Sequence, residues 1–160
     1  MEISVFRIDD RLIHGQIITA WIAYSDAKTI IVADDNAAKD EFTQSLLKMA
    51  TPNTIKLHIL SVKDAIELLK TDTLDTKVLL LVRTPQGAYD FLESGISVKS
   101  INIGNLNMKK GKTKILGNFW VTPEDVEYLH KIKEKGVGLE VRAVPNEKSQ
   151  DVMELFKKLK

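Results

Sequence analysis

Cysteine is absent from the 160-residue sequence, which excludes disulfides and thiol chemistry and suits a reducing cytoplasm. No apolar run approaches the roughly 20 residues needed to span a bilayer, and the first residues lack the charged and apolar regions of a signal peptide. The formal net charge is +1, so no global field draws the chain to nucleic acid or to an anionic membrane. These absences predict a soluble protein that binds no nucleic acid and meets a membrane only through a partner.

Motifs for nucleotides and metals are missing as well. There is no Gly-rich phosphate loop ending in Lys-Ser/Thr and no Gly-x-Gly-x-x-Gly after the first predicted strand, which weighs against a nucleotide enzyme. The three histidines are scattered, with no pair at the spacing of metal ligands, so we expect no metal and no other cofactor. His58 alternates with apolar neighbours and is expected to be structural, while His130 is expected to be solvated or locally packed.

Apolar periodicity predicts strands that alternate with single helices. The strands are expected at residues 3–7, 29–33, 55–60, 77–82, 99–103 and 139–144. The last helix is expected to include Leu159, and residues 104–118 are expected to form a long loop with room for a short strand at residues 114–116. This alternation indicates right-handed βαβ units. We therefore expect one α/β domain over residues 1–160, with an open, mostly parallel twisted sheet and helices on both faces.

In open α/β sheets the ligand site lies beyond the carboxyl ends of the strands, near the point where strand order reverses. Polar residues follow several predicted strands and would meet at that edge. They are Asp9 to His14 after the first strand, Asp34 and Asp35 after the second, Arg83 and Thr84 after the fourth, and Gly104 and Asn105 after the fifth. The turn after the first strand is the richest in functional side chains, so the site is expected there.

That turn is the segment RIDDRLIHGQ, residues 7–16, which runs from a strand into an amphipathic helical pattern. The start of a helix offers unpaired N–H groups and a partial positive charge, so it is a ready anion site. No core-forming role is expected for Arg7, Arg11 or His14 here. A histidine at such a turn can stabilise an oxyanion, move a proton or accept a phosphoryl group, and the alternative is a turn whose charges are simply solvated.

The same segment resembles the signature of the IIB subunits of the bacterial sugar phosphotransferase system, in its mannose/fructose/sorbose branch. The resemblance extends along the chain through Thr84-Pro85, residues 101–104 and residues 139–142. The sequence Gly104-Asn105-Leu106 departs from it, because many relatives carry paired glycines and methionine there. The resemblance implies an open, mainly parallel sheet with helices on both faces and a cytoplasmic phosphotransferase that associates peripherally with a membrane transporter.

The resemblance also implies a reaction. His14 would take a phosphoryl group on Nδ1 from a phosphohistidine of IIA and pass it to a sugar held by the membrane subunits IIC and IID. A neutral imidazole has a lone pair available near pH 7, and Arg11 can fork onto phosphate oxygens. The amides around Gly15 and Gln16 can donate to the same oxygens.

Three supporting roles follow from the residue types. Arg7 is expected to pair with Asp9 and orient the turn. Asp10 either stays exposed and limits the positive charge or holds a ring N–H of His14. A basic cluster in the long loop is either solvated or meets an acidic partner surface; its members are Lys109, Lys110, Lys112 and Lys114.

Three functions stay open on these grounds. The chain is a phosphohistidine carrier in sugar uptake, a small-anion or phosphometabolite binding module without covalent chemistry, or a hydrolase that forms and then breaks a phosphohistidine. Phosphorylated IIA distinguishes them by leaving stable phosphate on the protein, no phosphate, or free phosphate in solution.

Overall fold

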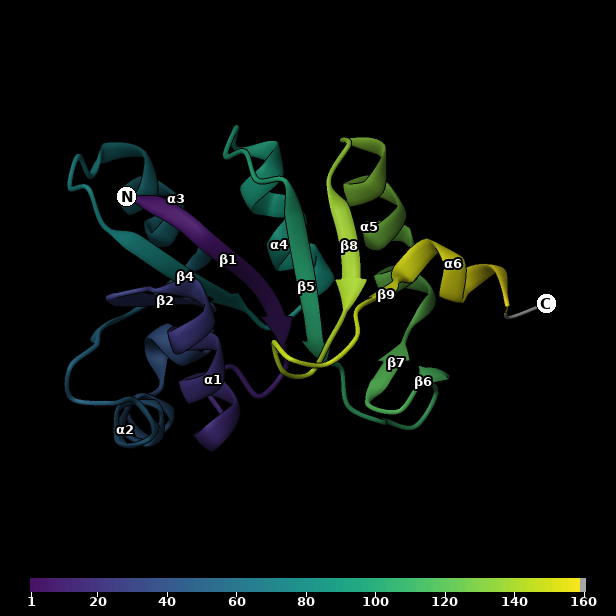
Figure 1. Cartoon of the computed structure of the whole chain (residues 1–160), viewed down its shortest axis with the longest axis horizontal. Helices are drawn as coiled ribbons and strands as arrows, with labels where there is room; N and C mark the ends of the chain where they lie inside the picture. Colours follow the sequence, from purple (N-terminus) through teal and green to yellow (C-terminus); the bar gives the residue numbers. More distant parts are fainter. Residues whose placement is uncertain (159–160) are drawn as a thin grey trace.

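Strand β1 (Glu2–Asp9) lies inside the main sheet, as Figure 1 shows for the computed structural model of this protein. The structure describes residues 1–158. The other elements are α1 (Gly15–Ser25), β2 (Thr29–Ala33), the short 3₁₀ helix η1 (Ala37–Lys39), α2 (Glu41–Ala50), β3 (Lys56–Leu60), α3 (Val62–Thr71), β4 (Lys77–Val82), α4 (Pro85–Glu93), β5 (Ser100–Asn105), β6 (Thr113–Leu116), β7 (Phe119–Val121), α5 (Pro123–Glu134), β8 (Gly138–Val141), β9 (Gln150–Asp151) and α6 (Val152–Lys157).

The main sheet has seven strands in the order β3-β2-β4-β1-β5-β8-β9, and β6 and β7 form a separate two-stranded sheet. Within the main sheet every pairing is parallel except that of β8 with β9. The chain therefore has the α/β class and the mostly parallel sheet that the sequence predicts.

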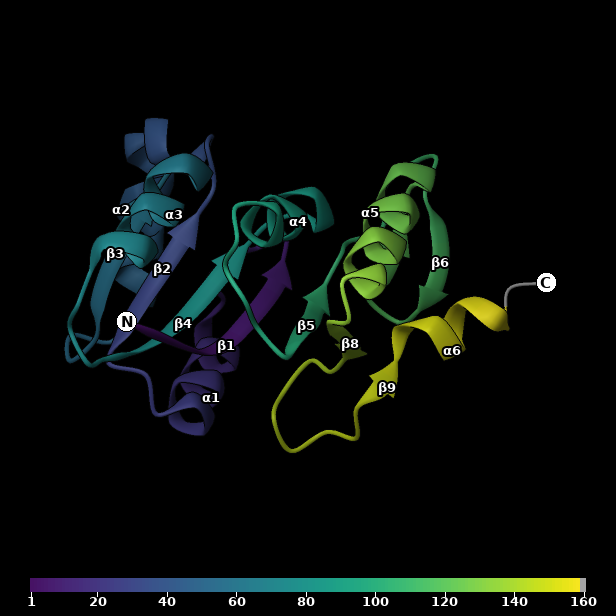
Figure 2. The ribbon, with the colours of Figure 1, turned by 90° about the horizontal axis from the view of Figure 1, so that it is seen from above.

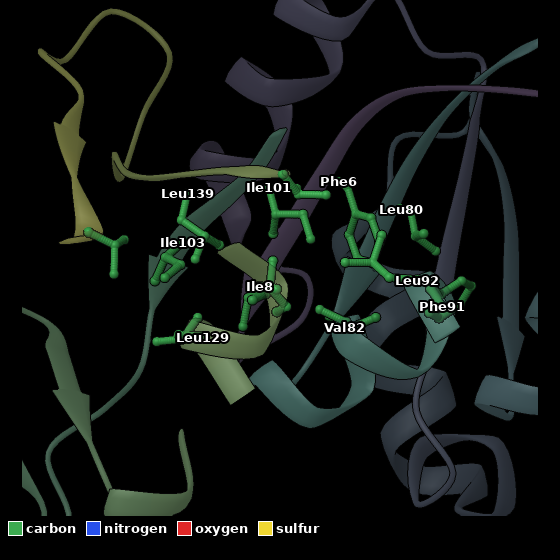
Figure 3. Close-up of a cluster of buried hydrophobic side chains, with 14 of the residues drawn as sticks. Phe6, Ile8, Leu80, Val82, Phe91, Leu92, Ile101, Ile103, Leu129 and Leu139 are labelled. Carbon is green, nitrogen blue, oxygen red and sulfur yellow. The ribbon is translucent and has the colours of Figure 1, made fainter. Parts of the chain in front are cut away.

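Helices cover both faces of this sheet, and each face has its own apolar core. One core joins the sheet to α1, η1 and α2 through Trp21, Ala37 and Leu47. The other joins it to α3, α4, α5 and α6. Figure 2 shows α1 below the strands and α3, α4 and α5 above them. In the second core, drawn in Figure 3, Phe6 of β1 meets Phe91 of α4 edge to face with ring centroids 5.5 Å apart. Right-handed connections that run in opposite directions along a sheet place their helices on opposite faces, which explains this division.

Several helices begin at the caps expected from the sequence. The hydroxyl of Thr84 accepts a hydrogen bond from the amide of Gly87 at 3.1 Å, with Pro85 as the first helical residue of α4. Thr122 and Asp125 form a reciprocal capping box at the start of α5. These local signals fix the residues at which α4 and α5 begin.

The boundaries differ from the prediction in places. Strand β5 continues to Asn105, so Gly104 and Asn105 lie in the strand and not in the loop after it. Strand β8 ends at Val141 and not at residue 144. The short strand expected at residues 114–116 is present as β6, but its partner β7 and the two-residue β9 were missed, because strands this short show no apolar period. Leu159 lies outside the described residues.

Among residues 1–158, no helix is long and apolar enough to cross a membrane.

Candidate functional site

The carboxyl ends of β1, β4 and β5 lie side by side at one edge of the main sheet, where Ile8 pairs with Val82 on one side and with Ile103 on the other. After β1 the chain turns to α1 on one face, and after β4 it turns to α4 on the opposite face. This divergence makes the end of β1 a switch point, the usual position of a ligand in an open α/β sheet. The segment from residue 7 to residue 16 lies at this point, as the sequence predicts.

Arg7 is buried in the face of the sheet that α1 covers, with 1% of its surface exposed. Its Nη1 donates to Oδ1 of Asn102 and, at 3.0 Å, to the carbonyl of Arg142. Its Nη2 donates to Oδ2 of Asp9 at 3.2 Å and to the carbonyl of Ala143 at 3.1 Å. Burial lowers the pKa of Arg7 to about 10, against the attraction of Asp9, so the guanidinium stays charged at neutral pH. The expectation that Arg7 has no core role was therefore wrong, while its pairing with Asp9 is confirmed.

Two neighbours shape the space around the Arg7 guanidinium. A Cβ atom on Gly104 would overlap with its Cζ, so β5 needs glycine at this position. Trp21 of α1 covers the opposite side, with Cζ of Arg7 5.0 Å from the ring centroid. The indole Nε1 of Trp21 also donates to the carbonyl of Ala143 at 2.9 Å. Arg7 thus joins β1, α1, β5 and the segment after β8 in one polar core.

Asp9 connects this buried core to the exposed turn. Its Oδ1 accepts from the backbone N–H of Arg11 at 2.9 Å and from Nε of Arg11 at 3.1 Å. Its Oδ2 accepts from Nη2 of Arg11 at 3.0 Å as well as from Arg7. The Arg11 side chain is 25% exposed, and its Nη1 has no acceptor within residues 1–158. One edge of the Arg11 guanidinium is therefore fixed, and the other is free to meet a ligand.

The turn that follows is strained and leads directly to His14. Leu12 is buried with φ of 61°, a left-handed conformation that a non-glycine residue adopts at a cost of about 1–2 kcal/mol. Its N–H donates to the carbonyl of Asp9 at 2.9 Å. His14 is exposed at the N-cap of α1, and its ring makes no capping hydrogen bond. In the part of the chain that is described, the exposed amides of Gly15 and Gln16 have no acceptor. A ring nitrogen and free N–H groups thus share one exposed turn.

Asp10 takes neither of the roles expected of it. Its Oδ1 accepts from Nδ2 of Asn105 at 2.7 Å, and its Oδ2 accepts from the backbone N–H of Asn107 at 2.7 Å. It therefore holds the loop after β5 against the β1–α1 turn and makes no hydrogen bond with His14. The side chain of Asn105, which is 1% exposed, is part of this link and not of an open loop.

The residues expected after β2 and β4 reach the site to different degrees. Arg83 contacts it directly, because its Nη1 donates to the carbonyl of Asp10 at 2.8 Å. Asp34 contacts it only through Arg83, with Oδ1 lying 3.3 Å from the arginine Nε. Thr84 caps α4, and Asp35 accepts from the backbone of Val62 at 2.9 Å, so Asp35 belongs to the start of α3 and not to the site.

Asn102, Trp21 and Arg142 support the site but were not predicted as parts of it. Asn102 interrupts the apolar run Ile101-Asn102-Ile103 and pairs in register with Arg7. A buried amide between two isoleucines in a central strand is a readable signal, because a buried polar group needs a partner. The guanidinium of Arg142 lies 5.2 Å from the Trp21 ring centroid. No local sequence pattern indicates this contact, because the two residues are far apart in the chain.

The other two histidines are distant from this turn. His58 lies half-buried in β3, where burial lowers its pKa with help from Lys56. His130 is exposed on α5 and lies near Phe156, with ring centroids 5.6 Å apart. Within residues 1–158, no group of three or more acidic, histidine or cysteine side chains is placed to hold a metal ion.

Comparison with known proteins covers nearly the whole chain. Residues 3–160 match the family model described as the PTS system sorbose subfamily IIB component. The sorbose-specific EIIB component of Lacticaseibacillus casei is 34% identical over 96% of this chain and 94% of that protein. The mannose-specific EIIAB component of Escherichia coli (strain K12) is 32% identical over 99% of this chain and 50% of that protein. The crystal structure of the IIBSor domain of the Klebsiella pneumoniae sorbose permease superposes with a TM-score of 0.95, at 28% identity over 100% of this chain and 99% of that one.

Proposed function

This chain belongs to the sorbose subfamily of the IIB components of the sugar phosphotransferase system, and from that membership we propose that it carries a phosphoryl group on His14. A IIB component takes part in sugar phosphotransfer and works with IIA; the Escherichia coli relative is named as a joint EIIAB component. The donor is phosphorylated IIA, as a protein or a domain, and the acceptor is a sugar held by the membrane subunits IIC and IID. The chain acts in the cytoplasm, at the face of the transporter.

The observation that supports this proposal most is the contrast between an exposed ring and a rigid support. His14 is exposed and its ring makes no hydrogen bond within residues 1–158, while Arg11, three residues before it, is held by three hydrogen bonds to the buried Asp9. Phosphoryl transfer needs positioning and charge stabilisation more than covalent help from the protein. The free Nη1 of Arg11 and the amides of Gly15 and Gln16 supply donors for phosphoryl oxygens at this turn.

Two transfers follow from this arrangement. In the first, the neutral Nδ1 of His14 attacks phosphorus, the bond from phosphorus to the donor histidine breaks, and the donor ring regains its electron pair. In the second, a sugar hydroxyl oxygen attacks phosphorus, the bond to Nδ1 of His14 breaks, and the hydroxyl proton ends on the freed imidazole or on water. Exposure of His14 suits both steps, because two different partners must reach the same ring nitrogen.

We assign no particular sugar to this chain from its relatives. Relatives of nearly equal identity, 34% and 32%, are named for sorbose and for mannose. The proposal therefore leaves sugar recognition to the membrane subunits.

Incubation with phosphorylated IIA followed by mass spectrometry tests the proposal. We expect one added phosphoryl group that is acid-labile and located on His14, absent from His14→Ala, and retained in His58→Gln and His130→Gln. Circular dichroism should show that His14→Ala stays folded, because the exposed ring has no partner within residues 1–158. Labelling that persists in His14→Ala would contradict the assignment. Free phosphate without labelled protein would indicate a hydrolase, and neither product would indicate a binding module.

A further inference from the structure

A hollow of about 180 Å³ lies between the β1–α1 turn, the start of α4 and the loop after β5, and Asp10 forms part of its wall. Its walls include Asp10, Arg83, Thr84, Asn107, Lys109 and Lys112. His14 is not among its lining residues. The hollow therefore shares a wall with the proposed phosphoryl site without being part of it.

The loop is folded so that two lysines flank the hollow. The backbone N–H of Lys112 donates to the carbonyl of Lys109 at 3.0 Å, closing a four-residue turn. Gly111 occupies the third position with φ of 89°, as a type II turn requires. The turn is tied down by Asn107, whose backbone N–H donates to Asp10. The first and last residues of such a turn are close in space, and both of these lysines line the hollow.

Around the hollow, most carboxylate oxygens already accept hydrogen bonds, whereas several cationic groups do not donate any in the described part of the chain. Both carboxylate oxygens of Asp10 already accept hydrogen bonds from the loop. Asp125, which also lines the hollow, is engaged in the α5 capping box through Oδ2. In contrast, neither Lys109 nor Lys112 forms an ion pair within residues 1–158. Nη1 of Arg83 donates to the carbonyl of Asp10, and its Nε lies 3.3 Å from Oδ1 of Asp34 as an ion pair without a hydrogen bond. Its Nη2 has no hydrogen-bond acceptor within residues 1–158. The hollow thus has three cationic side chains with available donors, whereas three of the four oxygens of its two carboxylates already accept hydrogen bonds.

Size narrows the class of ligand. Sites for drug-sized molecules and cofactors usually measure about 300–1,000 Å³, well above this hollow. At roughly 30 Å³ for each water, the space corresponds to about six water molecules. A phosphate group with the first atoms of its ester fits this volume, whereas a nucleotide does not.

We propose that this hollow is a second anion site that binds the phosphate group of a soluble phosphate monoester, of which a phosphorylated sugar is the relevant class. The class of ester rests on the proposed function, since the product of that reaction is a phosphorylated sugar. The anion would be held by Lys109, Lys112 and the free edge of Arg83, beside the turn that carries His14.

Isothermal titration calorimetry at low salt tests the site with the unphosphorylated chain and two probes, inorganic phosphate and glucose 6-phosphate. A lysine ammonium near a dianion at the surface is worth about fivefold in affinity, so Lys109→Gln with Lys112→Gln should weaken binding about 25-fold. The matched control is Lys70→Gln with Lys133→Gln, which removes the same charge from exposed lysines near the ends of α3 and α5, at the opposite end of the sheet. The control should bind like the wild type.

Three results would overturn the proposal. Equal weakening by the control pair would show that only net charge matters. Loss of binding in His14→Ala, with binding kept in the Lys109/Lys112 variant, would place the anion at the His14 turn and leave the carrier function intact. Lysine-dependent binding to vesicles of anionic phospholipid, without binding of either soluble probe, would show that the source is a lipid headgroup. The expected result is binding of both probes that persists in His14→Ala and fades as salt screens the lysines.

Discussion

Replacing Asp9 with asparagine should destabilise the protein strongly, because Asp9 is the carboxylate between two arginines. Its side chain is 2% exposed and accepts hydrogen bonds from Arg7 Nη2 and from three N–H groups of Arg11. The asparagine amide would keep one acceptor but would place an N–H group against a guanidinium. Breaking a buried charge pair costs about 3–5 kcal/mol, which for a chain of this size lowers the melting temperature by roughly 6–20 °C. Burial already lowers the pKa of Arg7 to about 10, and loss of Asp9 should lower it further.

A thermal melt followed by circular dichroism measures the effect, and Asp26→Asn provides the control. Asp26 is 69% exposed and lies 3.6 Å from Lys77, so this surface pair is worth at most about 1 kcal/mol. The control should melt within a few degrees of the wild type. If Asp9→Asn melts as close to the wild type as Asp26→Asn does, then the buried pair does not hold this part of the fold, and the reasoning fails.

Three further outcomes are expected. Gly104→Ala should force the Arg7 guanidinium out of its place and lower the free energy of unfolding by about 3 kcal/mol in a urea titration, whereas Gly138→Ala, with no atom closer than 3.5 Å, should be tolerated. Arg11→Ala should slow single-turnover transfer from phosphorylated IIA by about 10- to 150-fold, from the roughly 1.5–3 kcal/mol of a charged hydrogen bond, and Arg11→Lys by clearly less; wild-type rates in both would contradict a role in transfer. Burial lowers the pKa of His58, so the unfolded chain binds a proton on this imidazole at a higher pH than the folded chain does, and the free energy of unfolding decreases as the pH falls below about 6.5. The urea midpoint of His58→Gln should therefore fall less on acidification than that of the wild type. Parallel curves for the two proteins would show that His58 does not cause this loss of stability.

The main elements could be predicted from the sequence because local and global signals agree. Strand β4 is a continuous apolar run, and all of its residues from Val78 to Val82 are fully buried between helices on both faces. The helix starts at Thr84 and Thr122 were visible as a capping residue followed by proline. The β6–β7 pair was only half visible, because strands of four and three residues show no apolar period. The pairing of β7 with Leu106 leaves no local pattern either.

The position of the candidate site could be predicted from the sequence, and so could the pairing of Arg7 with Asp9. The burial of Arg7 could not be predicted. It arises only when β5 and the segment after β8 come together around β1, which brings Asn102 and the carbonyls of Arg142 and Ala143 to Arg7. Contacts between residues about 95 and 135 positions apart leave no local pattern. The role of Asp10 was hidden for the same reason, since its partners follow β5.

The burial of Arg7 and the partial exposure of Arg11 determine how positive charge reaches the proposed phosphoryl site. Arg7 is buried with all of its contacts internal, so it cannot touch a phosphoryl group on the exposed His14. Its positive charge acts through Asp9, which it neutralises in part, so that Asp9 can bind Arg11 without cancelling the positive charge of the turn. With Asp9 and both arginines counted together, the cluster keeps one net positive charge, and the free Nη1 of Arg11 is where that charge meets solvent. A single arginine paired with a carboxylate would leave no net charge there. The buried guanidinium is therefore what allows Arg11 to be held rigidly and still attract an anion.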